Sequence, residues 1–162
     1  MKILVVYVAQ ESRENLDHGL GKGVWGFTDK AKPDQFEEVK AGDVIVFGSG
    51  YTGGAPRTEF ELWQKNSIRK LLYATISSEC FESTQPEWRN EAAMPENERY
   101  KWRIRFDPQS VHSLENVALN DSSILSPKLS DYIRKSGCVQ GQTIITNCKS
   151  IGSSGIPISI RE

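Results

Sequence analysis

Basic and apolar side chains alternate along one segment in the second half of the chain. Its four cations are Arg99, Lys101, Arg103 and Arg105. Successive side chains of a β-strand point to opposite faces, so this spacing predicts a strand over residues 99–107 with all four cations on one face. Such a row of cations could bind the phosphates of a nucleic acid. The alternative is an exposed edge strand whose charges only prevent pairing with another strand.

Two of the four tryptophans lie outside the strongest strand patterns. Trp25 follows a glycine-rich segment and Trp88 lies in a polar stretch, whereas Trp63 and Trp102 fall where packing in the core is expected. An exposed aromatic ring near cations can stack on a nucleobase, which contributes about 1–3 kcal/mol per base. The alternative role for Trp25 and Trp88 is packing at the rim of the core.

Residues that could support catalysis or metal binding are sparse. The three cysteines include no C-x-x-C pair, and the two histidines fit no metal-ligand spacing. The sequence contains no G-x-S-x-G, no H-E-x-x-H and no phosphate-binding G-x-x-x-x-G-K-[ST] motif. We therefore expect no cofactor, no metal ion and no disulfide framework, with the reducing cytoplasm as the compartment.

The length and composition favour one globular domain. With 162 residues, 38% of them hydrophobic, we expect a single domain spanning residues 1–162 around one core. The net charge of −1 excludes a globally basic, histone-like binder but leaves room for a local basic face. The longest apolar run, residues 3–9, is far shorter than the roughly 20 residues of a membrane helix. We expect neither a membrane span nor a signal peptide.

Runs of β-branched and apolar residues predict the strands. These runs lie at residues 2–9, 24–27, 44–47, 68–78, 99–107, 143–146 and 156–160. The first is apolar almost throughout, as in strands that are buried on both faces. The glycine-rich segment 48–54 is expected to form a flexible loop, and the polar residues 79–98 a long loop that is either functional or mobile.

Helical signals are few and short. Ser12 begins a helical turn, and the glycines at positions 19, 21 and 23 are expected to prevent a long helix. Further turns are expected at 33–39 and 59–65, and Ser126-Pro127 with Gly137 bounds one later helix. The order of elements predicts an α+β fold, a mixed barrel-like sheet of about five to seven strands flanked by short helices.

The segment from Tyr7 to Phe27 resembles the opening of YTH domains. A strand leads into a polar turn that ends with Asn15, and Gly23-Val-Trp25 follows ten residues later. Residues 40–47 with the glycine-rich loop after them, and residues 98–106, resemble EVE domains, while residues 129–146 resemble the tail of EVE-like domains fused to McrB-type restriction GTPases. The chain is thus similar, over most of its length, to EVE/YTH domains of the PUA-like superfamily.

This resemblance implies a PUA-like barrel with an aromatic cage for a modified base, which in YTH domains is N6-methyladenine. It implies Trp25 as one wall of the cage, Trp88 as the second and Met94 as the third. Asn15 would bond a ring nitrogen of the base, and the backbone at Gly26 would meet the methylamino group. YTH domains usually carry Ser or Cys at the position of Gly26, so a modified cytosine stays open as an alternative.

The leading hypothesis is a reader of a modified base in DNA that has no chemistry of its own. It would be the specificity module of a modification-dependent restriction system, with a fused or associated GTPase motor and a nuclease as partners. One alternative is an RNA-binding PUA-like protein in RNA modification or translation, because nothing in the sequence identifies a contact to a 2′-hydroxyl group. Another is an ASCH-like enzyme that processes a modified nucleoside.

Overall fold

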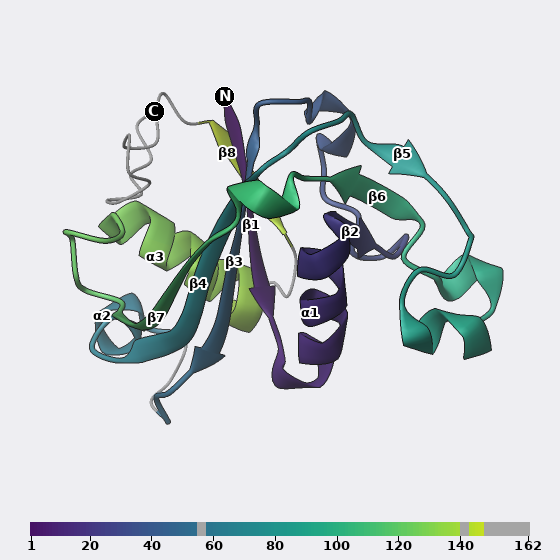
Figure 1. Ribbon diagram of the computed structural model, residues 1–162. Helices are drawn as coiled ribbons and strands as arrows, with labels where there is room; N and C mark the ends of the chain where they lie inside the picture. Colours follow the sequence, from purple (N-terminus) through teal and green to yellow (C-terminus); the bar gives the residue numbers. More distant parts are fainter. Residues whose placement is uncertain (55–57, 140–142, 148–162) are drawn as a thin grey trace.

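The computed structural model describes residues 1–54, 58–139 and 143–147, and it has the predicted α+β class (Figure 1). The larger sheet has the strand order β7-β4-β3-β1-β8, and the smaller one the order β2-β6-β5. The larger sheet comprises β1 (Lys2–Val8), β3 (Val44–Tyr51), β4 (Ser67–Thr75), β7 (His112–Ala118) and β8 (Ile144–Asn147). The smaller sheet comprises β2 (Val24–Phe27), β5 (Phe81–Glu82) and β6 (Trp102–Arg105).

The larger sheet is mixed, and its central strands β1 and β3 are buried on both faces. β1 pairs with β3 in parallel, and the other neighbouring strands are antiparallel. Ile3 and Val5 of β1 pack toward α3 (Pro127–Arg134), whereas Leu4 and Val6 pack toward α1 (Arg13–Lys22) and the smaller sheet. The apolar run at residues 2–9 predicted this strand correctly, because both of its faces lie in the core.

The barrel expected from the sequence is not closed in the part of the chain that the structure describes. The strands there form two separate sheets, joined by an isolated bridge between Ile76 and Phe106. β8 confirms the strand expected at 143–146. The strand expected at 156–160 lies outside the described residues.

Two expectations about glycine-containing segments are corrected. The segment after Ser12 forms a ten-residue helix, α1, where only a turn was expected; it runs through Gly19 and Gly21 to Lys22, and Gly23 caps it with a left-handed φ of 70°. A side chain at Gly19 would clash with the Val24 carbonyl, so this glycine lets α1 lie close against β2. β3 likewise continues through Gly48 to Tyr51, where a flexible loop was expected, because its pairing with β1 and β4 holds these residues in the sheet.

Short helical turns complete the described part of the chain. α2 (Phe60–Trp63) lies in the segment 59–65 where a turn was expected, and the turns η1 (Gln10–Ser12), η2 (Phe36–Glu38), η3 (Arg89–Ala93), η4 (Glu96–Glu98), η5 (Pro108–Ser110) and η6 (Lys135–Val139) lie between the larger elements. None of the helices within the described ranges has both the length and the apolar character that crossing a bilayer requires.

Candidate nucleic-acid interface

A cavity of about 200 Å³ lies where β1 and β2 meet the segment that precedes β6. Its aromatic lining comes from Tyr7 of β1, Trp25 of β2 and Tyr100. Further lining residues are Val6, Gly26, Phe27, Ala31, Ser136 and Thr143. We call this cavity the base pocket. Sites for drug-sized ligands have volumes of roughly 300–1,000 Å³. The base pocket is smaller than these sites, as suits a ligand group the size of a single heterocyclic base.

Trp25 is held at the base pocket by edge-to-face contacts. Its ring centroid lies 5.3 Å from that of Phe47 and 6.2 Å from that of Trp88, with interplanar angles of 75° and 79°. The side chain is nevertheless only partly buried, because it also lines the cavity. Trp25 is therefore an oriented, accessible ring, as the resemblance to YTH domains implies for a cage wall.

Gly26 lets the Tyr100 backbone and the Trp88 ring lie close against β2. A Cβ atom at this position would lie 2.8 Å from the Tyr100 carbonyl oxygen and 2.9 Å from the Trp88 ring. Both neighbours are fixed, one as backbone and the other as a buried indole, so any side chain here must displace them. Position 26 thus has no room for the Ser or Cys side chain of YTH domains, because Tyr100 lies too close to it.

We expect Gly26→Ala to lower the free energy of unfolding by about 1–3 kcal/mol, as overpacking does elsewhere, and to weaken ligand binding at the base pocket. Gly21→Ala is the matched control, because a Cβ atom there meets nothing within 4 Å. Replacing glycine by alanine inside a helix raises the free energy of unfolding by roughly 0.5–1 kcal/mol. Urea unfolding of both variants measures the difference; equal stability of the two would contradict the steric role of Gly26.

Trp88 supports the base pocket from behind and is not one of its walls. Only 2% of the residue is exposed, and its indole Nε1 donates to the backbone carbonyl of Asn15 at 3.0 Å. Its ring lies edge-on to that of Tyr100, with 5.5 Å between the centroids. The cage-wall role expected for Trp88 is therefore corrected, since the rings of His18, Trp25 and Tyr100 pack edge-on against its indole.

Asn15 and Met94 also lie apart from the described lining of the base pocket. The Asn15 side-chain amide donates to the Tyr100 hydroxyl at 3.4 Å, and the Asn90 amide donates to the same oxygen at 3.0 Å. Asn15 thus orients Tyr100 instead of facing a base. Met94 follows η3, and its carbonyl accepts a hydrogen bond from the Arg99 side chain. The structure does not bring Met94 to the cavity.

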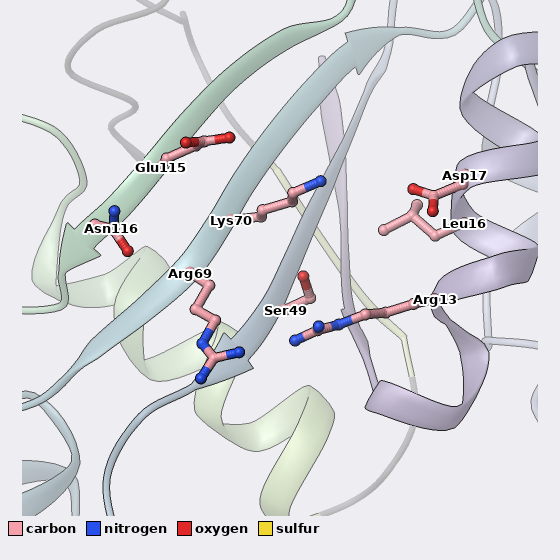
Figure 2. A pocket seen from close by; sticks show the side chains of 8 residues that line it. All are labelled: Arg13, Leu16, Asp17, Ser49, Arg69, Lys70, Glu115 and Asn116. Atoms are coloured by element: carbon pink, nitrogen blue, oxygen red, sulfur yellow. The ribbon is translucent and has the colours of Figure 1, made fainter.

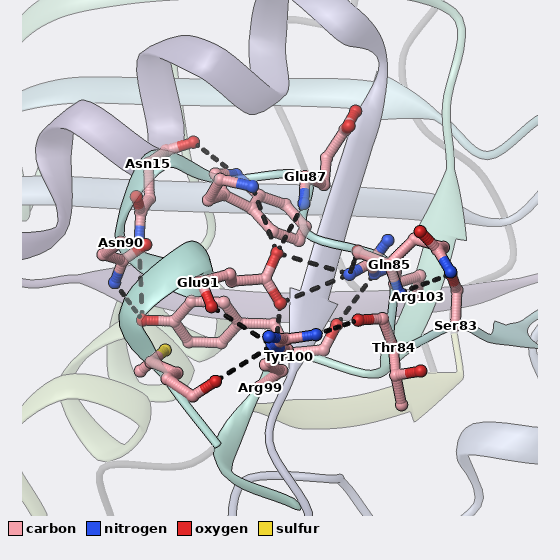
Figure 3. Close-up of polar contacts among 12 residues, drawn as sticks. Asn15, Ser83, Thr84, Gln85, Glu87, Asn90, Glu91, Arg99, Tyr100 and Arg103 are labelled. Carbon is pink, nitrogen blue, oxygen red and sulfur yellow. Dashed lines mark hydrogen bonds and ion pairs between the residues drawn. The ribbon is translucent and has the colours of Figure 1, made fainter. Parts of the chain in front are cut away.

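The long loop before β6 is organised around one buried carboxylate, that of Glu91 (Figure 3). Its oxygens accept hydrogen bonds from the backbone N–H groups of Glu87 at 2.9 Å, Trp88 at 3.1 Å and Tyr100 at 3.0 Å. The same carboxylate pairs with the Arg103 guanidinium at 3.2 Å. These bonds place Trp88 and Tyr100 next to β2, so Glu91 builds one side of the base pocket without lining it.

The expected row of cations does not form. β6 begins only at Trp102, and Arg103, with 6% of its side chain exposed, is buried against Glu91 and donates to the Tyr100 carbonyl at 2.9 Å. Arg99 donates to the carbonyls of Glu91 and Thr84 at 3.1 and 2.8 Å. Both guanidinium groups satisfy loop backbone that the fold buries, which removes them from the candidate phosphate contacts.

The two remaining cations of the row differ from each other. Lys101 pairs with Asp29 at 3.1 Å. Hydrogen bonds from the Trp102 indole N–H, which has the larger effect, and from Lys101 lower the pKa of the Asp29 carboxyl below its usual value. Arg105 is exposed, and its guanidinium lies 4.9 Å from the centre of the Phe81 ring. Within the described residues, Arg105 is thus the one member of the row that is exposed without an ion pair.

Three residues of this region were not singled out from the sequence. Tyr7 belongs to the continuous apolar run at residues 2–9, Tyr100 occupies a position that alternation assigns to the apolar face, and Glu91 belongs to a polar loop without periodicity. The pairing of Glu91 with Arg103 joins two segments through tertiary contacts alone. The sequence offered one signal for the base pocket, a tryptophan outside the strongest strand patterns, and this signal identified Trp25.

No family model matches this sequence, and no curated protein is significantly similar to it. Among solved structures, the chain is similar to the N-terminal domain of Thermococcus gammatolerans McrB bound to m5C DNA, with 14% identity and a TM-score of 0.44 over 70% of this chain and 76% of that one.

The chain is also similar to two YTH structures. One is the YTH domain-containing protein mmi1 in complex with RNA, with 11% identity, a TM-score of 0.40 and coverage of 80% of this chain and 62% of that one. The other is the YTH domain of the Zygosaccharomyces rouxii MRB1 protein in complex with N6-methyladenosine RNA, with 10% identity, a TM-score of 0.39 and coverage of 75% and 65%. The chain spans slightly less than two thirds of these two YTH chains. Both kinds of domain that the sequence resembles, the McrB N-terminal domain and the YTH domain, are thus among its structural neighbours.

Proposed function

We propose that the base pocket binds one modified nucleobase that has left its stack, and that the chain is a reader of modified nucleic acid. The observation that carries this proposal is the meeting of Trp25 and Tyr100 at a single cavity, with Gly26 between them. The two rings come from distant parts of the sequence, and the Glu91 network fixes one of them in place. A preformed pocket of this kind lowers the entropic cost of binding.

The energetics of the base pocket suit a methylated base. Leaving the stack costs a few kcal/mol, whereas stacking on an aromatic side chain returns about 1–3 kcal/mol per base. A methyl group enlarges the apolar edge of the base, and the apolar residues Val6, Phe27 and Ala31 offer that edge a matching surface. The hydroxyl groups of Ser136 and Thr143 can bond polar atoms of the base. Because hydroxyl groups are the side-chain polar groups of this lining, the proposal assigns binding without turnover.

The finer assignment rests on the sequence resemblance to EVE and YTH domains. N6-methyladenine is the favoured base and a modified cytosine the alternative, with DNA favoured over RNA. The domain would serve as the specificity module of a modification-dependent restriction system, and a GTPase motor and a nuclease would act on the bound DNA as fused or associated partners. A protein that reads modified RNA is the alternative within the same site geometry.

The test is a matched panel of single-stranded DNA and RNA oligonucleotides at one stated salt concentration. Each carries N6-methyladenine, 5-methylcytosine, 5-hydroxymethylcytosine or no modification at one position. We expect at least about tenfold tighter binding to one modified strand, equivalent to about 1.4 kcal/mol. Equal affinity for every strand, or a product in chromatography after incubation, would overturn the proposal. Preference for a modified RNA would select the RNA alternative.

A further inference from the structure

Two cavities larger than the base pocket lie at the ends of β1 and β3 and beside α1. One, of about 390 Å³, is lined by residues of α1, β3, β4 and β7 (Figure 2), and the other, of about 370 Å³, by residues of β1, η1 and the end of β3. Both are lined by Arg13 and Arg69, and we call the two together the arginine groove. Tyr7 lines both the groove and the base pocket, so the two sites adjoin.

The cations of the arginine groove are available to a ligand. Arg13 is the first residue of α1, and Arg69 and Lys70 are consecutive residues of β4. Arg69 and Lys70 are exposed and Arg13 partly exposed, and within the described part of the chain none of the three side chains has an ion pair or a hydrogen bond. This distinguishes them from Arg99, Lys101 and Arg103, whose donors are occupied.

A buried hydroxyl faces the same space. Ser49 of β3 is only 1% exposed, yet it lines the groove, and its hydroxyl has no partner among the described residues. Figure 2 shows the Arg13 side chain reaching from α1 toward Ser49, with the Arg69 guanidinium beside β3. Among the described residues, the fully buried side-chain atoms without a partner are His18 Nε2, Trp63 Nε1 and Ser130 Oγ, so the Ser49 hydroxyl keeps some access to the groove. The hydroxyl and the two guanidinium groups can converge on one anion.

The sheet is distorted where it presents these residues. Gly50 lies between the registered pairs Ser49–Lys70 and Tyr51–Ile68, and it has a φ of 75°. A Cβ atom there would lie 2.7 Å from the Arg69 Cβ, so glycine leaves room for the stem of that side chain. Consecutive residues of a regular strand point to opposite faces, whereas Arg69 and Lys70 line one cavity. The distortion therefore concentrates positive charge on one face.

Carboxylates also line the arginine groove, and their position limits where an anion can bind. They are Asp17 of α1, Glu115 of β7 and Glu11 of η1. In Figure 2 Asp17 and Glu115 lie toward the Lys70 end of the cavity, whereas the Arg13 and Arg69 guanidinium groups point toward its other end, near Ser49; Glu11 lines the second cavity. The favourable position for an anion is thus next to Ser49, between the two arginines.

We propose that Arg13, Arg69 and Ser49 bind a backbone phosphate of the strand whose modified base occupies the base pocket. This inference rests on the proposed function. Guanidinium groups bind phosphate oxygens through paired, charge-assisted hydrogen bonds, and the Ser49 hydroxyl donates a further one. Tyr7 lines both the base pocket and the cavity that shares Arg13 and Arg69 with the Ser49 cavity, so a strand that inserts its base beside Trp25 would pass over the groove. The groove takes the role that the sequence pattern assigned to residues 99–105.

The test combines Arg13→Gln, Arg69→Gln and the double variant with Lys40→Gln as the control. Lys40 is exposed and precedes the start of β3, at the opposite end of that strand from Ser49, so its loss changes the net charge by as much as either single arginine variant does. Binding to modified and unmodified oligonucleotides is measured by fluorescence anisotropy over a range of salt concentrations. For the double variant we expect about tenfold weaker binding to both strands and a salt slope lower by roughly 0.7–0.9 for each lost phosphate contact. The ratio of the two affinities should stay unchanged.

A double variant whose affinity and salt slope equal those of Lys40→Gln would overturn the phosphate site. Ser49→Ala gives a second measure, because we expect about fivefold weaker binding with an unchanged unfolding midpoint. Inorganic phosphate that displaces the unmodified strand at micromolar concentration would assign the groove to free phosphate and also overturn the inference. If the wild-type chain binds all strands equally while the double variant still loses salt slope, the groove stands and the modified-base proposal alone fails.

Discussion

Trp25→Ala should remove most of the preference for the modified base while affinity for the unmodified strand changes little. The indole is the accessible ring of the base pocket, and stacking on it contributes about 1–3 kcal/mol, or roughly 5- to 150-fold in the affinity ratio. The unmodified strand relies mainly on phosphate contacts, which this change leaves in place. Dissociation constants for matched modified and unmodified oligonucleotides at one salt concentration measure the effect.

Two further variants separate stacking from folding. Trp25→Phe should give an intermediate preference, because the smaller ring keeps part of the stacking area. Trp25→Leu keeps apolar contact with Phe47 and Trp88 but has no ring face, so its preference should be as low as that of the alanine variant. Urea unfolding identifies any loss of stability. A folded Trp25→Ala chain that still prefers the modified strand would end the assignment of Trp25 as a cage wall.

Glu91→Ala is the substitution for which we expect the largest loss of stability, about 3–5 kcal/mol. Its carboxylate is completely buried, accepts three backbone N–H groups and pairs with Arg103. The alanine variant leaves the Arg103 guanidinium uncompensated in the interior and releases the segment that carries Tyr100. We therefore expect loss of modified-base preference together with a lower urea midpoint, and the midpoint is the direct measurement.

The charge of the pair can be tested separately from its hydrogen bonds. Glu91→Gln keeps the size of the side chain but leaves Arg103 charged, so we expect an intermediate loss of stability. Combining Glu91→Gln with Arg103→Met removes both charges, and the double variant should be more stable than the sum of the single losses predicts. A Glu91→Ala chain that unfolds at the wild-type urea concentration would show that the loop does not depend on this carboxylate.

Local sequence patterns determined the central part of the fold. The run at residues 2–9 and the run at 44–47 became β1 and β3, because apolar β-branched residues suit strands covered on both faces. The Ser126-Pro127 start produced α3, since a serine hydroxyl and a proline at the first helical position satisfy the helix terminus locally. The same reasoning identified Trp25 as an aromatic residue outside the inner core.

Patterns failed where the partner of a residue lies far away in the sequence. Period two assigned Arg103 and Arg105 to the same face, yet Arg103 is buried and Arg105 exposed. The difference comes from Glu91, whose buried charge requires a cation that alternation cannot identify. The glycines failed for a related reason, since Gly19 and Gly50 make room for the Val24 carbonyl and the Arg69 side chain, which other elements supply.

The sequence by itself thus determined the α+β class, the central strands and one ring of the candidate site. The tertiary structure alone decided that Tyr100 lines the same cavity as Trp25, that the buried Trp88 ring packs edge-on against both, and that Arg13, Arg69 and Ser49 line another cavity together. Strand and helix patterns reflect a residue's nearest neighbours in the chain. A binding site depends on which distant side chains the packing brings together and which of their charges it leaves unpaired.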